Sequence, residues 1–104
     1  RMKIAATANG AAASIYEFEA WTPQKQNAAL ATTGAVPSAS SFALANQTRH
    51  FENLTDGSVD RRQSFPWVSA SGGPAWFRID FPKPVTLQSI TWHNGSSVPA
   101  DYVI

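Results

Sequence analysis

Apolar and polar side chains alternate in two stretches near the start of the chain. Residues 1–8 place Met2 and Ile4 on one face, with polar side chains between them. Residues 14–21 repeat the alternation over two faces, with Tyr16, Phe18 and Ala20 on one and Ile15, Glu17 and Glu19 on the other. A period of two is typical of half-buried β-strands. Because Asn9-Gly10 is a preferred type I′ turn dipeptide, the pattern predicts a β-hairpin.

The remaining sequence predicts more strands and no helix. Residues 75–81 alternate, so that Phe77 and the apolar side chains after it face away from Trp76. Residues 85–92 form another apolar strand, whose phase slips and therefore needs a bulge. A further strand begins at residues 101–104. Together with the first two strands, this pattern predicts an all-β fold, an antiparallel β-sandwich.

Turn-forming segments separate these strands. Residues 22–26, Thr-Pro-Gln-Lys-Gln, contain a proline that breaks a strand ladder, and they are predicted to form a linker or boundary. Residues 27–45 are rich in alanine, but Gly34 and Pro37 limit any helix to a turn or two, so we expect extended chain with loops. Residues 53–57, Asn-Leu-Thr-Asp-Gly, predict a tight turn.

Composition and charge exclude several classes of function. The 104 residues suffice for one domain or for parts of two. A net charge of +1, with only 14% charged residues, argues against a nucleic-acid or membrane-surface binder. No apolar run approaches the ~18 residues of a membrane span, so no membrane insertion is expected. Without cysteine, the chain forms no disulfides and has no thiolate nucleophile.

Six motifs after residue 26 occur in an order that matches a known family. The motifs are Asn27-Ala28-Ala29-Leu30, Asn53-Leu54-Thr55-Asp56-Gly57, Trp67, Trp76-Phe77-Arg78-Ile79-Asp80-Phe81, Pro84-Val85-Thr86-Leu87 and Asp101-Tyr102-Val103-Ile104. In this order they resemble the discoidin family, the coagulation factor 5/8 type C domains, which are grouped with family 32 carbohydrate-binding modules. The resemblance implies a jelly-roll sandwich of the galactose-binding-like fold. It also places Trp67 and Trp76 at core positions, which implies structural roles for both.

The first 21 residues resemble the other end of the same family. Residues 1–4 and 13–21 are similar to its final pair of strands, so the family's end precedes its beginning and its middle is missing. The sequence therefore predicts a hairpin over 1–21, a linker over 22–26 and the first two thirds of a discoidin-like domain over 27–104. Three explanations remain open for this incomplete or permuted order. They are an excerpt across two tandem domains, a circular permutant, and a strand-exchanging subunit completed by its neighbour.

The resemblance implies a calcium site at the Asp56-Gly57 turn. In the family this turn wraps a structural Ca²⁺, and the corresponding oxygen ligands here come from Asp56, Glu17, Asn53 and Ser58. The first two supply carboxylates and the last two backbone carbonyls, which suit the six to eight oxygens that Ca²⁺ takes. Asp60 stands where the family often has a hydroxyl ligand and can substitute for it. Two alternatives remain open, a turn without metal and a site filled by the guanidinium of Arg61.

Aromatic and polar side chains in two loops suggest a glycan-binding site. A sugar ring needs a flat aromatic face for its C–H side and hydrogen-bonding groups for its hydroxyls. These groups are supplied by Arg62, Phe65, His93 and Asn94 if the two loops meet at one end of the sandwich. The alternatives are an ordinary exposed aromatic side chain or packing against a neighbouring subunit.

Three Asn-x-Ser/Thr sequons begin at Asn46, Asn53 and Asn94. These are acceptor motifs for N-glycosylation, and they favour an extracellular or cell-surface glycoprotein. Asn53 is the least favoured acceptor, because its segment would wrap the metal.

Catalytic signatures are missing from the sequence. His50 and His93 lack the spacing of metal ligands, and there is no nucleophile elbow or phosphate loop. The sequence therefore predicts a noncatalytic extracellular binding or adhesion module that recognises a glycan or cell-surface glycoconjugate, within a larger repetitive or multidomain protein. The main alternative is a structural subunit or repeat of a filament or cell-surface assembly, completed by strand exchange with neighbouring copies. The third possible function is that of a domain appended to a secreted glycosidase.

Overall fold

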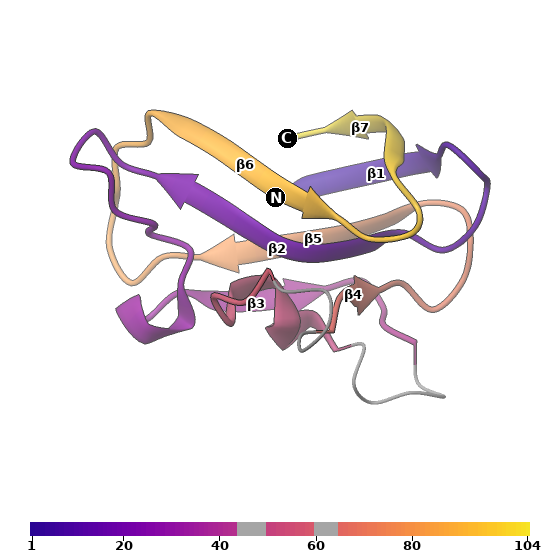
Figure 1. The fold of residues 1–104 in the computed structure, drawn as a ribbon, viewed down its shortest axis with the longest axis horizontal. Helices are drawn as coiled ribbons and strands as arrows, with labels where there is room; N and C mark the ends of the chain where they lie inside the picture. Colours follow the sequence, from indigo (N-terminus) through magenta and orange to yellow (C-terminus); the bar gives the residue numbers. More distant parts are fainter. Residues whose placement is uncertain (44–49, 60–64) are drawn as a thin grey trace.

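Two antiparallel β-sheets make up the structure, a computed structural model that describes residues 1–43, 50–59 and 65–104 (Figure 1). One sheet has the strand order β3-β5-β1-β7 and the other β4-β2-β6. The elements are β1 Met2–Thr7, β2 Ser14–Trp21, η1 Ala31–Thr33, β3 Val36–Ala39, η3 Phe51–Thr55, β4 Trp67–Val68, β5 Ala75–Asp80, β6 Ser89–Asn94 and β7 Pro99–Val103. The predicted all-β fold is thereby confirmed, and the two η elements are short 3-10 helices.

The first two strands form as predicted but do not pair with each other. β1 pairs with β5 and β7, whereas β2 pairs with β4 and β6. The predicted hairpin is therefore wrong, because the chain crosses from one sheet to the other between Thr7 and Ser14. In this loop the Asn9 side chain accepts a hydrogen bond from the Ala11 amide (3.1 Å), and the Thr7 hydroxyl donates to the Ala11 carbonyl (2.7 Å). These bonds hold a wider turn than a two-residue hairpin loop requires.

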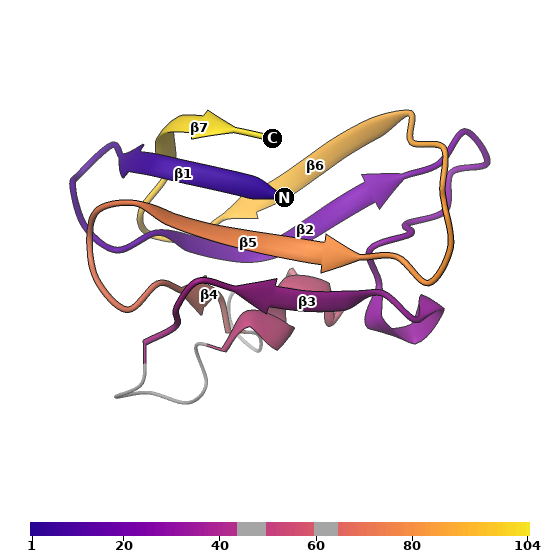
Figure 2. The same cartoon turned by 180° about the vertical axis from the view of Figure 1, so that it is seen from behind.

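The first 21 residues supply an inner strand to each sheet. β1 lies between β5 and β7, and β2 lies between β4 and β6, as Figure 2 shows for the four-stranded sheet. Residues 22–26, predicted to be a linker, form a closed loop in which the Thr22 amide donates to the Gln26 carbonyl (2.9 Å). The Asn27 side chain accepts hydrogen bonds from the amides of Ala20 (2.9 Å) and Ala29 (3.0 Å). This side chain therefore anchors the loop to the end of β2.

A bulge in β2 changes which side chains face the core. The register between β2 and β6 shifts between Ile15 and Glu17, so Ile15 joins Phe18 and Ala20 in the hydrophobic core. The alternation predicted for residues 14–21 is therefore wrong at Ile15. The bulge expected in residues 85–92 is not needed, because β6 begins only at Ser89, where its pairing with the end of β2 begins.

Edge-to-face aromatic contacts join the two sheets across the core. The Phe77 ring centroid lies 5.2 Å from that of Phe18 and 5.5 Å from that of Trp67. Trp67 is fully buried, and its indole N–H donates to the Ser41 carbonyl (2.9 Å), so its predicted structural role is confirmed. The core position expected for Trp76 is wrong. β5 turns Ala75 and Phe77 inward, and Trp76 therefore lies half-buried on the outer face of the four-stranded sheet.

The predicted Asp56-Gly57 turn is present, directly after η3. The Asp56 carboxylate accepts a hydrogen bond from the Ser58 amide (2.9 Å), and Gly57 has a φ of 81°. Glycine adopts this left-handed conformation at little cost, because it has no Cβ. The sequence prediction missed η3 itself, which is capped by His50, whose Nδ1 accepts from the Glu52 amide (3.2 Å).

Candidate functional site

The carboxyl group of Glu17 is buried, although it belongs to an ionisable residue of a strand. Its side chain belongs to β2 and the residue is only 1% exposed. Oε2 accepts a hydrogen bond from the Gly57 amide (2.9 Å), which ties β2 to the turn after η3. Oε1 is buried and has no hydrogen-bond donor within the described part of the chain. Because a buried polar atom without a partner is costly, this oxygen calls for a proton of its own, a cation or a bound water.

The Asp56 carboxyl lies within hydrogen-bonding reach of Glu17. Both groups are acceptors when ionised, so a hydrogen bond between them exists only when one of them holds a proton. Burial raises the pKa of Glu17 to about 9, with further contributions from this hydrogen bond and from the charges of Asp56 and Glu19. The hydrogen bond from Gly57 acts in the opposite direction. Without a cation, Glu17 is therefore protonated at neutral pH.

The residues around this carboxyl pair fit a hard cation such as Ca²⁺. The amides of Gly57 and Ser58 each occupy one carboxyl oxygen, on Glu17 and Asp56 respectively. The unpartnered Glu17 oxygen is a ligand of the type that Ca²⁺ prefers. Asn53 lies in η3 and Ser58 directly follows the turn, so their backbone segments flank Asp56.

Among the described residues, further ligands would come from carbonyl groups, with water completing the coordination. In the described ranges no group of three or more acidic, histidine or cysteine side chains is arranged to hold a metal ion. Asp60, predicted as an additional ligand, and Arg61, predicted as a competing cation, lie outside the described residues. Within the described residues, the groups that would hold a Ca²⁺ are therefore the Glu17–Asp56 pair and the backbone beside it.

The side chains predicted to contact a glycan lie on both sides of β2. Phe65 is 52% exposed and precedes β4, whereas His93 and Asn94 end β6. β2 lies between these two strands, and its Ile15 pairs with Trp67 of β4 on one side and with Asn94 on the other. The residues therefore share one end of the three-stranded sheet, with β2 between Phe65 on one side and His93 and Asn94 on the other. Arg62 lies outside the described residues.

His93 and Asn94, the polar members of this predicted glycan site in the described ranges, are already engaged. His93 Nε2 lies 3.0 Å from Glu19 Oε1, in a half-buried pair across β2 and β6. The Asn94 side chain accepts from the indole N–H of Trp92 (3.0 Å). Of the three described members, Phe65 is thus the side chain most open to a ligand, and a sugar would reach His93 only in competition with Glu19.

Two of the sequons lie in the described part of the chain. The Asn53 side-chain amide donates to the Pro66 carbonyl (3.1 Å), so a glycan on that nitrogen would compete with the bond. The Asn94 side chain accepts a hydrogen bond from Trp92 through its oxygen, whereas a glycan would be attached to its nitrogen. Asn46 lies outside the described residues.

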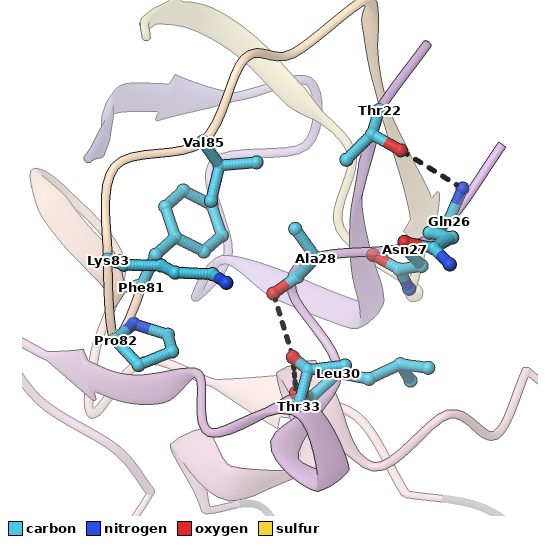
Figure 3. Close-up of a pocket in the computed structure, with 10 residues that line it drawn as sticks. All are labelled: Thr22, Gln26, Asn27, Ala28, Leu30, Thr33, Phe81, Pro82, Lys83 and Val85. Atoms are coloured by element: carbon cyan, nitrogen blue, oxygen red, sulfur yellow. Dashed lines mark hydrogen bonds between the residues drawn. The ribbon is translucent and has the colours of Figure 1, made fainter. Parts of the chain in front are cut away.

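A hollow that no sequence motif marks lies at the other end of β2 (Figure 3). It measures about 490 Å³ and lies between the loop that follows β2 and residues 81–85. Phe81, Val85 and Leu30 make it largely apolar, and the Lys83 side chain extends across it beside Phe81. The Thr33 hydroxyl near its wall donates to the Ala28 carbonyl (3.1 Å). The hollow therefore offers apolar contact and one ammonium group, but no pair of groups for acid–base chemistry.

Comparisons do not assign the chain to a family. Among the described residues, no helix is long and apolar enough to cross a membrane. A search of family models, of curated proteins and of solved structures finds no match. The case for a function therefore rests on the carboxyl pair, the exposed aromatic side chains and the sequence motifs.

Proposed function

We propose that the chain is a noncatalytic, discoidin-like binding module of an extracellular or cell-surface protein, which holds a structural Ca²⁺ and recognises a glycan. The observation that carries this proposal is the meeting of Glu17 with the Asp56-Gly57 turn. The two are 40 residues apart along the chain, and the Gly57 amide donates to the buried Glu17 carboxyl. The motif resemblance assigns Ca²⁺ to this pair, and the unpartnered oxygen of Glu17 supports that assignment. In the proposed role, Ca²⁺ would join β2 to the turn and hold the neighbouring loops in place.

Glycan recognition is supported by the placement of Phe65 beside a rigid sheet. Phe65 is 52% exposed and lies two residues before the start of β4, which pairs with β2. An aromatic side chain in a loop that ends at a paired strand loses less conformational entropy when a sugar stacks on it than one far from any strand. Loops positioned by a rigid scaffold are the usual location of such sites.

Removing the Phe65 ring should weaken glycan binding. We expect calorimetric titration of the Ca²⁺-loaded chain to show binding to at least one of lactose, maltotriose and chitotriose. Phe65→Ala should weaken this binding about tenfold, because the ring would no longer stack on the sugar. Leu87→Ala, at a side chain that is 37% exposed and does not belong to the predicted site, should leave it unchanged. If the native chain binds none of the three sugars, the proposed glycan recognition is wrong.

A structural role in an assembly is the second candidate, and the edge strand β7 favours it. Among the described strands β7 pairs with β1 alone, and its Tyr102 and Val103 are 44% and 66% exposed. An exposed apolar edge strand can pair with a strand of another chain. In this role β7 would join neighbouring copies of the chain.

Edge pairing should make the chain self-associate. Sedimentation velocity over about a hundredfold concentration range should then show oligomers. Val103→Lys should disperse them, because a charged side chain on an edge strand opposes pairing. Val36→Lys, on the opposite edge strand β3, is the matched control, since Val36 is 60% exposed. A monomer at every concentration, or dispersal by Val36→Lys alone, would contradict pairing through β7.

A further inference from the structure

Trp76 is a half-buried aromatic side chain on the outer face of the four-stranded sheet. Its neighbours on β5, Ala75 and Phe77, point into the core and are 6% and 1% exposed. The indoles of Trp67 and Trp92 donate to Ser41 and to Asn94 respectively. Within the described ranges the indole N–H of Trp76 has no such acceptor. Trp76 therefore presents both a flat apolar face and a hydrogen-bond donor outside the core.

Trp76 lines a hollow of about 480 Å³ that crosses β5, β1 and β7. On β1, Lys3 is paired with Trp76 on one side and with Val103 on the other. The next residue of β1 that points to this outer face is Ala5, because Ile4 between them is buried. The short side chain of Ala5 leaves the sheet surface open beside the indole. We call this space the Trp76 hollow, lined among others by Lys3, Ala5, Ser40, Trp76, Asp101 and Val103.

The backbone around the Trp76 hollow is held rigidly. The Ser40 amide donates to the Trp76 carbonyl (2.9 Å), and the Trp76 amide donates to the Ser40 hydroxyl oxygen (3.0 Å). These bonds continue the pairing of β3 with β5 beyond Ala39. The indole is therefore mounted on a paired strand, which fixes its position before a ligand arrives.

The polar groups of the Trp76 hollow carry one charge of each sign. Lys3 contributes an ammonium group and Asp101 a carboxylate, and within the described ranges neither forms an ion pair. Because the two charges offset each other, the hollow has no net preference for an anion or a cation. A donor on β1 and an acceptor on β7, both on the same side of the indole, match the hydroxyls of a neutral sugar whose C–H face stacks on the ring. The volume lies within the roughly 300–1,000 Å³ of small-molecule sites.

We propose that the Trp76 hollow is a second binding site for a neutral glycan. One sugar ring stacks on the Trp76 indole, and its hydroxyl groups bond to Lys3 and Asp101. The ligand class rests on the proposed function, but the location does not, because the Trp76 hollow lies on the other sheet from Phe65 and β6. Binding at this face uses the strands themselves as the platform and requires none of the loops.

The test uses the Ca²⁺-loaded full chain with lactose, maltotriose and chitotriose as probes, followed by calorimetry and saturation-transfer NMR. We expect Trp76→Ala to weaken binding of at least one of these sugars about tenfold. Ala5→Trp should weaken it similarly by filling the Trp76 hollow. This second variant adds a side chain at an exposed strand position and removes no packing. Trp21→Ala is the matched control, since Trp21 is also half-buried on a strand but does not line the hollow.

Each outcome of this test has a distinct meaning. If Trp76→Ala and Ala5→Trp both bind every sugar that the native chain binds, and with the same affinity, the proposed second site is wrong. If Phe65→Ala abolishes binding in that case, the proposed function stands without the second site. If Trp21→Ala weakens binding as much as Trp76→Ala, the effect is not specific to the hollow and the inference fails. If the native chain binds none of the sugars, the inference and the proposed function fail together.

Discussion

Saturating Ca²⁺ should raise the melting temperature of the chelator-treated chain by about 10–20 °C. A ligand at about 100 times its dissociation constant stabilises the folded state by ~2.7 kcal/mol. In a domain of about 100 residues, each kcal/mol moves the melting temperature by roughly 4–8 °C. The stabilisation arises because the cation would coordinate the orphaned oxygen of Glu17 and separate it from the Asp56 carboxylate. Thermal unfolding followed by circular dichroism, with chelator and then with excess Ca²⁺, measures the shift.

Glu17→Gln tests the origin of that shift. The amide keeps the shape of the side chain and removes its charge, so Ca²⁺ should no longer stabilise the variant. The metal-free variant should nevertheless be at least as stable as the metal-free native chain near neutral pH, where Glu17 is already uncharged. Glu52→Gln, at an exposed residue of η3, should preserve the full response to Ca²⁺. An unchanged melting temperature of the native chain on adding Ca²⁺ would mean that a proton alone fills the site.

The metal-free chain should become less stable as the pH rises. The pKa of Glu17 is about 9 in the folded state and 4.5 as an unperturbed carboxyl, so the folded chain retains a proton that the unfolded chain releases. The stabilisation is complete below the unfolded value and is lost as the pH rises through the folded value. Between the two, the free energy of unfolding should fall by about 1.4 kcal/mol per pH unit. Two pH units therefore remove ~3 kcal/mol, a large part of the 5–15 kcal/mol typical of a domain.

Urea unfolding in chelator at about pH 5.5 and 7.5 measures this dependence. Glu17→Gln should flatten it, since the amide does not titrate, and Glu52→Gln should retain it. Excess Ca²⁺ should restore stability at the higher pH, where the cation competes with fewer protons. Equal stability of the metal-free native chain at both pH values would show that the Glu17 carboxyl is not held protonated by its surroundings.

Local sequence determined where most strands and one turn form. The alternation in residues 2–7 and 75–80 requires only that one face of each strand be buried, and both segments are strands. Asp56 and Gly57 likewise form their turn through a neighbouring amide and the conformational freedom of glycine. These features depend on contacts within a few residues, so any fold that buries the apolar faces retains them.

The candidate sites depended on contacts that local sequence does not encode. A period of two shows that a strand has two faces, but it does not specify a partner, so the expected hairpin was wrong and β1 lies in a different sheet from β2. At the level of the sequence, only the resemblance to a family connects Glu17 with Asp56, since no spacing rule links residues so far apart. The same applies to the hollow at Phe81, which two distant loops enclose.

The tryptophans show the division between sequence and tertiary structure most clearly. The sequence by itself placed Trp76 on a strand, whereas only the resemblance to a family placed Trp67 at a core position. Only the assembled sheets decided that Trp67 fills the space between them, while Trp76 faces outward over β1. The physical reason is that burial depends on what packs against a face, and that is set by strands distant in the sequence. A bulge of one residue in β2 acted in the same way, because it turned Ile15 into the core.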